Sequence, residues 1–476
     1  MKRHLFYLLS TFALLSACST DPGKTSEVKE TKDSIPAKEK FETGKVIERM
    51  TNLSDPSQTY ALYLPSYYKP EQPLPVMYFF DAHAMGKLPV EMYSGLAETY
   101  GFILVGSNNS KNGTNWNEIQ SIAGKLFSDS QERISINTSR VYLCGFSGGA
   151  RVANALCISN GGIAGVICCG ASGPAANTKD PRSNYTFLGI CGNKDFNYVE
   201  MRKYDMVDLA GKNVKHAFVE FDGKHEWPAA EAMDLGFLWT MVTDMRAKRI
   251  PVSDSVIINR MEPMALRVSE LKKQGKTYEA FNMLKRQINF FDGLTDLSSA
   301  MNLYKSYKTD PVIDRAMKKE ENTWKKEEEL QAFYQEAFQS KSLEWWKQDI
   351  ASMNKKIKSS ADEGEKLMYA RIMDYLSLIA YMQTNGAIQQ NSLPAAKIYS
   401  DIYLLVDPSN SEAHYLAASL AAAEGNEKKT FSELEESIRL GFTDAARLQS
   451  DPGFSKINTK EEFLDIVKKA NAPPAQ

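Results

Sequence analysis

The chain has 476 residues, of which 43% are hydrophobic and 24% are charged, and its formal net charge is −2. This length indicates two or three domains rather than one, and the apolar content is sufficient for packed cores. A net charge so close to zero provides no general attraction for a polyanion. We therefore expect no nucleic-acid partner.

The first residues have the features of an export signal. Two basic residues precede an apolar stretch at 5–15 that is too short to span a bilayer. The letters LSAC at 15–18 resemble the lipobox of bacterial lipoproteins, in which the peptide is cut before a cysteine that becomes acylated. The resemblance implies a signal peptide at 1–17, lipid attachment at Cys18, and a lipid-anchored protein of the cell envelope, on the periplasmic or surface face of the outer membrane. An ordinary secretory signal that happens to end in a cysteine is the alternative.

Residues 18–42 begin with this cysteine and are otherwise polar and charged, without apolar periodicity. Such a composition predicts a flexible tether between the lipid anchor and the folded part. Five further cysteines follow, an odd number without metal-site spacing, so we expect buried apolar thiols and no metal site. Because export permits disulfides, a bond from Cys191 to Cys168 or Cys169 on a neighbouring strand is the alternative.

Residues 43–250 alternate short apolar runs with longer helical stretches. The runs are rich in β-branched and aromatic residues, as is typical of strands buried on both faces of a parallel sheet with helices between them. They lie at 60–64, 76–80, 102–105, 141–144, 165–169, 186–191 and 217–221. This region is predicted to be an α/β domain.

The composition changes after residue 254. Only seven of the 28 glycines lie there, strand-like runs are absent, and Lys/Glu-rich stretches such as 317–331 predominate. Scarce glycine and charge pairs four residues apart favour an all-helical domain at 255–476.

Within this helical domain, the stretch 395–442 resembles a tetratricopeptide repeat, with Gly425 and Asn426 at the turn between two helices. The stretch 264–291 is similar to another helix pair, with Gly275 at its turn. A plain helical bundle is the alternative. Such a domain either packs only against its neighbour or also binds a protein partner.

A serine at position 147 stands between a predicted strand and a predicted helix. The letters GFSGG at 145–149 match the pattern G-x-S-x-G, which is weak evidence by itself. Its context strengthens it, because a strand, a sharp turn and a helix force the serine into a strained conformation and expose its hydroxyl at the carboxyl end of the sheet. Ser147 is therefore the expected nucleophile, and Gly145 and Gly149 are needed where strand and helix nearly touch.

A serine hydroxyl is a poor nucleophile without a base, so a histidine is required downstream. The chain offers five histidines, which are His4, His83, His216, His225 and His414. The first lies in the predicted signal peptide, the second precedes the serine, the third begins an apolar strand and the last belongs to the helical domain. The fourth, His225, follows the last predicted strand and precedes a helix, and it is the predicted base.

The imidazole of the base needs an acceptor on its other nitrogen, which orients the ring and stabilises its charged form. The chain order Ser, Asp, His places this acid between the serine and the histidine, at the end of a strand. Asp195 follows the predicted strand 186–191 and fits this position. Of the aspartates that follow it, Asp205 and Asp208 fall in a helical stretch and Asp222 lies in the turn before His225.

These segments, GFSGGA, GNKDFN and DGKHEW, preceded by YALYLPSYYKPEQPLPVMYFFDAHA, resemble the α/β-hydrolase superfamily, in particular its exported esterase and polyhydroxybutyrate-depolymerase-like branch. The resemblance covers about 43–250. It implies a mostly parallel sheet of about eight strands and ester or thioester cleavage through an acyl-enzyme. It also implies an oxyanion hole made by the backbone N–H groups of Gly148 and His83, although Asp81 and Ala82 replace the family's His-Gly.

The leading hypothesis is therefore a cell-envelope serine hydrolase that acts on a small-molecule or saccharide-linked carboxylic ester. No metal site or phosphate loop is visible, and no cofactor is implied. A serine peptidase, an acyltransferase with the same triad, and an inert helical-repeat scaffold are the alternatives. The loop after the predicted strand at 102–105 either lines a polar-ester pocket or provides turn chemistry, through Asn108, Asn109, Asn112, Asn115 and Trp116.

Overall fold

The computed structural model describes residues 39–173 and 185–471. The predicted signal peptide, Cys18 and the predicted tether up to residue 38 lie outside these residues. Among the helices of the described ranges, none combines the length and the apolarity that crossing a bilayer takes. We call residues 39–250 the sheet domain and residues 254–471 the helical region.

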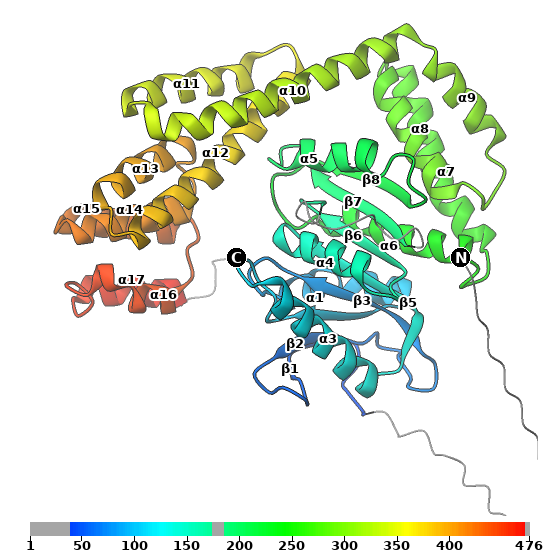
Figure 1. The fold of residues 1–476 in the computed structure, drawn as a ribbon, viewed down its shortest axis with the longest axis horizontal. Coiled ribbons are helices and arrows are strands. Elements are labelled where there is room, and N and C mark those ends of the chain that lie inside the picture. The colour runs from blue at the N-terminus through cyan, green and yellow to red at the C-terminus, as the bar shows by residue number, and fades with distance from the viewer. Residues whose placement is uncertain (1–38, 174–184, 472–476) are drawn as a thin grey trace, which may run out of the picture.

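An eight-stranded sheet forms the centre of the sheet domain (Figure 1). Its strands are β1 (Val46–Thr51), β2 (Thr59–Tyr63), β3 (Leu74–Phe80), β4 (Ile103–Ser107), β5 (Ile136–Phe146), β6 (Gly165–Cys169), β7 (Thr186–Gly192) and β8 (Lys215–Phe221). Their order across the sheet is β1-β2-β4-β3-β5-β6-β7-β8, and only β2 runs antiparallel to its neighbours. This arrangement confirms the predicted α/β-hydrolase fold.

Helices cover both faces of the sheet, which explains the continuous apolar runs of the central strands. One face carries α3 (Trp116–Arg133) and α4 (Gly148–Ser159). The other carries α1 (Lys87–Met92), α2 (Ser94–Tyr100) and α6 (Ala230–Arg246). A short helix, α5 (Tyr198–Lys203), follows β7 and continues into the π-helical turn η1 (Tyr204–Asp208).

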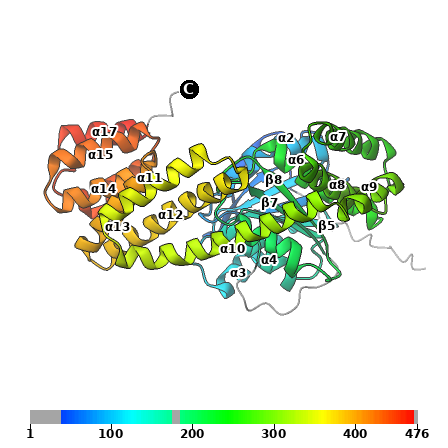
Figure 2. The ribbon, with the colours of Figure 1, turned by 90° about the horizontal axis from the view of Figure 1, so that it is seen from above.

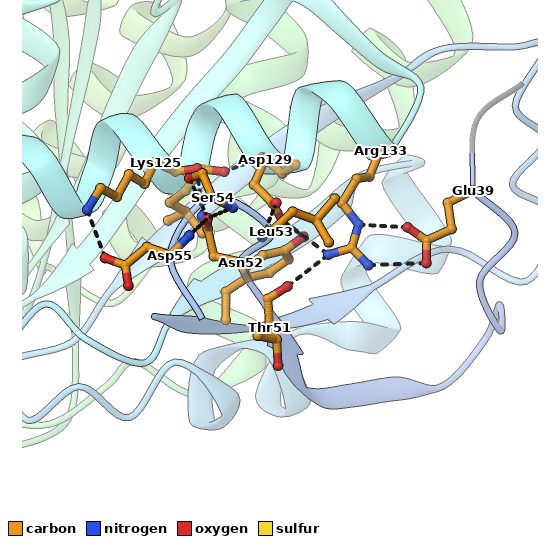
Figure 3. Close-up of polar contacts among 12 residues, drawn as sticks. Glu39, Thr51, Asn52, Leu53, Ser54, Asp55, Lys125, Asp129 and Arg133 are labelled. Carbon is orange, nitrogen blue, oxygen red and sulfur yellow. Dashed lines mark hydrogen bonds and ion pairs between the residues drawn. The ribbon is translucent and has the colours of Figure 1, made fainter. Parts of the chain in front are cut away.

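The residues just before β1 contact the end of α3 (Figure 3). Arg133 donates from Nε to a carboxylate oxygen of Glu39 at 2.7 Å, and from Nη1 to the carbonyl of Thr51 at 3.0 Å and to Asp129 at 3.2 Å. The Arg133 side chain is 9% exposed, and a charge so deeply buried needs such partners. Residues 39–42, which the sequence assigns to the tether, therefore contact the sheet domain at its N-terminal edge.

The helical region confirms the predicted all-helical C-terminal part. Its helices are α7 (Asp254–Lys273), α8 (Thr277–Phe291), α9 (Ser298–Lys308), α10 (Pro311–Ser340), α11 (Leu343–Ser359), α12 (Glu363–Gln389), α13 (Leu393–Val406), α14 (Ser411–Ala423), α15 (Glu427–Arg439), α16 (Ala445–Ser450) and α17 (Glu461–Asn471), with the 3-10 turn η2 (Pro452–Phe454). Gly275 and Gly425 have φ of 73° and 76° at the turns after α7 and α14, where glycine meets no steric penalty. The tetratricopeptide resemblance stays a prediction.

The helical region packs on the sheet domain in two places. Helices α7 and α8 join the core on the α6 face, through Ile257, Met264, Phe290 and Phe291. Helix α10, which at 30 residues is about 45 Å long, crosses the region of α5 and β8 and leads to α11 and α12 (Figures 1 and 2). We call α10 and α12 together the helical arm.

Candidate active site

Ser147 forms the turn between β5 and α4. Its φ of 54° and ψ of −122° lie outside the regions that non-glycine residues ordinarily adopt. A Cβ on Gly145 would lie 2.2 Å from the carbonyl oxygen of Gly149, and a Cβ on Gly149 would lie 2.0 Å from that of Phe80. Strand and helix therefore approach so closely that these two positions require glycine, as the sequence indicated.

The structure brings Ser147, His225 and Asp195 into hydrogen-bond contact. Nε2 of His225 lies 2.9 Å from Oγ of Ser147, and Nδ1 lies 2.9 Å from both carboxylate oxygens of Asp195. The three residues follow β5, β7 and β8, whose parallel directions bring their carboxyl ends to one edge of the sheet. This is the arrangement of a nucleophile, a base and an orienting acid.

The histidine–aspartate pair lies in a largely apolar environment. The side chain of Asp195 is 1% exposed and that of His225 is 16% exposed. The imidazole lies between the rings of Phe146 and Phe196, with centroid distances of 4.7 and 4.2 Å. Asp195 also accepts the backbone N–H of Asn197 at 2.8 Å. Because water is mostly excluded, the electrostatic interaction within the pair is stronger than on an open surface.

The two backbone N–H groups of the predicted oxyanion hole differ in their hydrogen-bond partners. Gly148 is the first residue of α4, where backbone N–H groups have no partner within the helix. The N–H of His83, however, donates to Oδ1 of Asp81 at 2.7 Å, and Oδ2 of Asp81 accepts the indole N–H of Trp227 at 2.9 Å. The buried carboxylate of Asp81 therefore occupies the His83 donor, and the assignment of the His83 amide to the oxyanion hole stays a prediction.

The asparagines after β4 divide into two groups. Asn109 accepts the first backbone N–H of β2 at 2.8 Å, Asn108 donates to a backbone carbonyl of β1 at 3.2 Å, and Asn115 caps the start of α3. These three provide turn chemistry. Asn112 differs, since its Oδ1 would lie 1.8 Å from a Cβ on Gly148, so its carboxamide lies against the turn that carries the serine. The sequence held no signal that separated this asparagine from its neighbours.

A further carboxylate comes from the helical region. Asp374 lies on α12, and one of its oxygens, Oδ2, is buried and has no hydrogen-bond partner in the described ranges. Burial, and then the negative charge of Asp195, raises its pKa to about 6. Lys224 and His225 act in the opposite direction. No sequence pattern pointed to this residue, which is far along the chain from the other site residues.

The remaining titratable groups show no metal centre. In the part of the chain that the structure describes, no three or more His, Cys, Asp or Glu side chains gather as metal ligands would. The five cysteines are buried as thiols, and burial is the main reason why the pKa values of Cys168, Cys169 and Cys191 are raised. The alternative disulfide from Cys191 to Cys168 or Cys169 is therefore not formed.

Comparisons with known proteins show distant similarity to solved structures. No protein-family model matches the chain, and no curated protein matches it. The chain is similar to a ferulic acid esterase (16% identity, TM-score 0.32, 40% of this chain and 94% of the other). It is also similar to an S-formylglutathione hydrolase from Agrobacterium tumefaciens (16%, 0.31, 38% and 88%) and to esterase B from Lactobacillus rhamnosis (16%, 0.34, 44% and 90%).

Proposed function

We propose that this chain is a serine hydrolase that cleaves carboxylic esters, with Ser147 as the nucleophile, His225 as the base and Asp195 as the orienting acid. One observation carries the proposal: the imidazole contacts the serine hydroxyl through one nitrogen and the buried carboxylate through the other, at 2.9 Å each. The strained backbone of Ser147 supports it, because such strain is typical of residues held in place for chemistry.

In the proposed reaction, Oγ of Ser147 attacks the carbonyl carbon of the ester while its proton passes to Nε2 of His225. Asp195 accepts the Nδ1–H and stabilises the imidazolium. When the tetrahedral intermediate collapses, the leaving alcohol takes the proton from Nε2 and the acyl group stays on the serine. A water molecule then loses a proton to Nε2 and attacks the acyl carbon. The bond from this carbon to Oγ breaks, the carboxylic acid leaves, and Oγ takes back the proton from Nε2.

The negative oxygen of the intermediate needs donors that are already in place. The N–H of Gly148 is the first candidate, because it directly follows the nucleophile. The amide group of Asn112 is our candidate for the second, since its donor atom Nδ2 would lie 3.3 Å from a Cβ on Gly148, whereas the His83 amide is bound to Asp81.

We further propose that the enzyme is attached to the outer membrane through acylated Cys18, and that it acts on small-molecule or saccharide-linked esters. The letters LSAC at 15–18 support the anchor. Mass spectrometry of the mature N-terminus tests it: we expect a chain that begins at Cys18 and carries acyl groups. An unmodified N-terminus at another residue would refute the anchor.

A fluorophosphonate probe tests the hydrolase proposal directly. We expect it to phosphonylate the purified full-length protein, with the adduct mapped to Ser147 by peptide mass spectrometry and absent from Ser147→Ala. A panel of aryl and sugar esters with different acyl groups then defines the substrate. Failure of the folded wild-type protein to form an adduct would refute the proposal and favour an inert scaffold.

A further inference from the structure

The segment that carries Asp195 lies between the sheet and the helical arm. We call residues 192–197 the acid loop. On one side its N–H groups bond to the end of β8 and the segment after it, with Asn193 donating to the carbonyl of Phe221 at 2.8 Å and Lys194 to that of Gly223 at 2.9 Å. These bonds place the acid loop beside the segment that carries His225. These hydrogen bonds hold only the side of the acid loop that faces β8.

The helical arm contacts the other side of the acid loop through apolar groups. Trp324 of α10 packs with Cys191, which immediately precedes the loop, and with Tyr198, which immediately follows it. Phe196 packs against the hydrophobic core of the helical region, while its ring lies 4.2 Å from that of His225. The same phenyl ring therefore contacts both the arm and the imidazole.

The arm also donates hydrogen bonds to the loop. Arg371 of α12 donates from Nη1 to the carbonyl oxygen of Asn193 at 2.9 Å, and its guanidinium lies 4.7 Å over the ring of Tyr198. Gln331 of α10 donates to the carbonyl oxygen of Phe196 at 3.4 Å. The arm therefore provides donors to backbone carbonyls on both sides of Asp195.

Arg371 is itself fixed by a buried ion pair. Its Nε and Nη2 donate to the carboxylate of Glu327 on α10 at 2.6 to 3.0 Å. The two side chains are 4% and 0% exposed. A buried guanidinium is stable only when its donors are satisfied, and here the carbonyl of Asn193 satisfies the one that points to the loop. The interaction between α10 and α12 thus determines where the loop carbonyl lies.

We propose that the helical arm positions the catalytic acid, with Arg371, held by Glu327, as a positioning residue that acts through the carbonyl of Asn193. This inference rests on the proposed function. An orienting carboxylate must stay within about half an ångström of the position in which it binds the imidazole, because small displacements of catalytic groups reduce turnover strongly. The helical region then helps to hold the acid loop in its active position.

The test replaces the ion pair by apolar side chains. Arg371→Met alone would leave Glu327 as an uncompensated buried charge, so we combine it with Glu327→Leu, since exchanging a whole buried pair for apolar groups often preserves stability. The matched control is Glu412→Leu with Arg447→Met. Arg447 pairs with Glu412 at 2.6 Å and lies 4.1 Å over the ring of Tyr415, within α14 and α16.

We expect the Glu327/Arg371 double variant to lower kcat for a small aryl ester about 10- to 100-fold, with KM changed less than about twofold. The fluorophosphonate labelling rate should fall by the same factor as kcat. Hydrogen–deuterium exchange should become faster in the peptide that contains the acid loop. The control variant should leave kcat, the labelling rate and the exchange rate unchanged. Arg371→Lys, which keeps a cation and a donor, should have a kcat much closer to wild type than the double variant has.

A folded Glu327/Arg371 double variant with wild-type kcat and wild-type loop exchange would overturn the inference. If this variant does not fold, Arg371→Lys is compared with Arg371→Gln: a clearly higher kcat for lysine supports the inference, and equal values overturn it. The two proposals fail differently. A wild-type protein that forms no adduct refutes the proposed function, whereas a labelled wild type with equally labelled arm variants refutes only the role of the arm.

Discussion

The sheet edge and the helical region each contain a buried or half-buried histidine–carboxylate pair, but the two pairs differ at the second ring nitrogen. His225 contacts Asp195 at 2.9 Å, and His414 contacts Glu433 at 2.6 Å. The other nitrogen of His225 faces a serine hydroxyl, which can donate to it. That of His414 lies 3.0 Å from the carbonyl of Pro408, which can only accept. Nε2 of His414 must therefore donate there, so this nitrogen offers no lone pair to a substrate proton.

A histidine–carboxylate pair therefore does not act as a base on its own account. The third partner decides, and at the sheet edge this partner is a serine held with φ of 54°. Removal of the serine hydroxyl, which distinguishes the two pairs, should therefore have the largest effect on activity.

We expect Ser147→Ala to lower kcat for an aryl ester about 10⁴- to 10⁶-fold, because no other group can form the acyl-enzyme. Steady-state hydrolysis with a purified, folded variant measures this. Ser306→Ala, on an exposed part of α9, is the control and should behave as wild type. An unchanged rate for Ser147→Ala would remove the basis of the proposed function.

The same carboxylate-to-amide substitution in each pair tests whether only the pair beside Ser147 contributes to kcat. Asp195→Asn should lower kcat about 10⁴-fold, since the amide favours the wrong tautomer of the imidazole. Glu433→Gln makes the same chemical change in the helical region, and we expect it to alter stability only. Hydrolysis rates and thermal unfolding of both variants measure the difference. Similar losses of kcat in both would mean that the sheet-edge pair has no special role.

A smaller effect is expected from the asparagines after β4. Asn112→Ala should lower kcat about 10²- to 10³-fold if its carboxamide binds the oxyanion. Asn115→Ala, from the same loop, should lower the free energy of unfolding by about 1 kcal/mol through the lost cap of α3 and leave kcat unchanged. If the two variants have the same kcat, Asn112 has only a turn-forming role.

The last predicted effect is on stability rather than on kcat, and it depends on pH. The pKa of Asp374 is raised to about 6 from 3.8, so the folded state binds this proton more tightly than the unfolded state. The stabilising contribution of protonated Asp374 to the free energy of unfolding is therefore present at low pH and is lost as the pH rises through about 6. The charges facing it are those of Asp195, Lys224, His225 and Asp407.

Asp374→Asn should consequently raise the free energy of unfolding by up to about 3 kcal/mol at pH 8 and hardly at all at pH 4. Urea unfolding of wild type and variant at both pH values measures this difference. Comparing the two proteins at each pH cancels the titration of all other groups. An equal gain in the free energy of unfolding at both pH values would show that ionisation of Asp374 does not destabilise the folded state.

The fold was largely predictable because the central strands are buried on both faces and are apolar throughout. The seven predicted runs all correspond to strands, and 165–169 coincides with β6. Strand β1 was missed since it lies at the edge of the sheet and most of its residues are partly or fully exposed. Helix α12 falls in the predicted all-helical part, but its bounds were not predicted, because buried residues occupy much of its circumference and leave no clear apolar period.

The sequence by itself determined the α/β domain, the helical C-terminal part and the three residues that meet at the sheet edge, because strand, turn and helix signals are local in the chain. Only the tertiary structure decided which neighbours surround these residues. Asp81 binds the His83 amide, Asn112 lies against Gly148, and Arg371 reaches a carbonyl 178 residues away. Such contacts depend on how long segments pack, and a contact between distant segments leaves no periodicity or spacing that a single sequence can reveal.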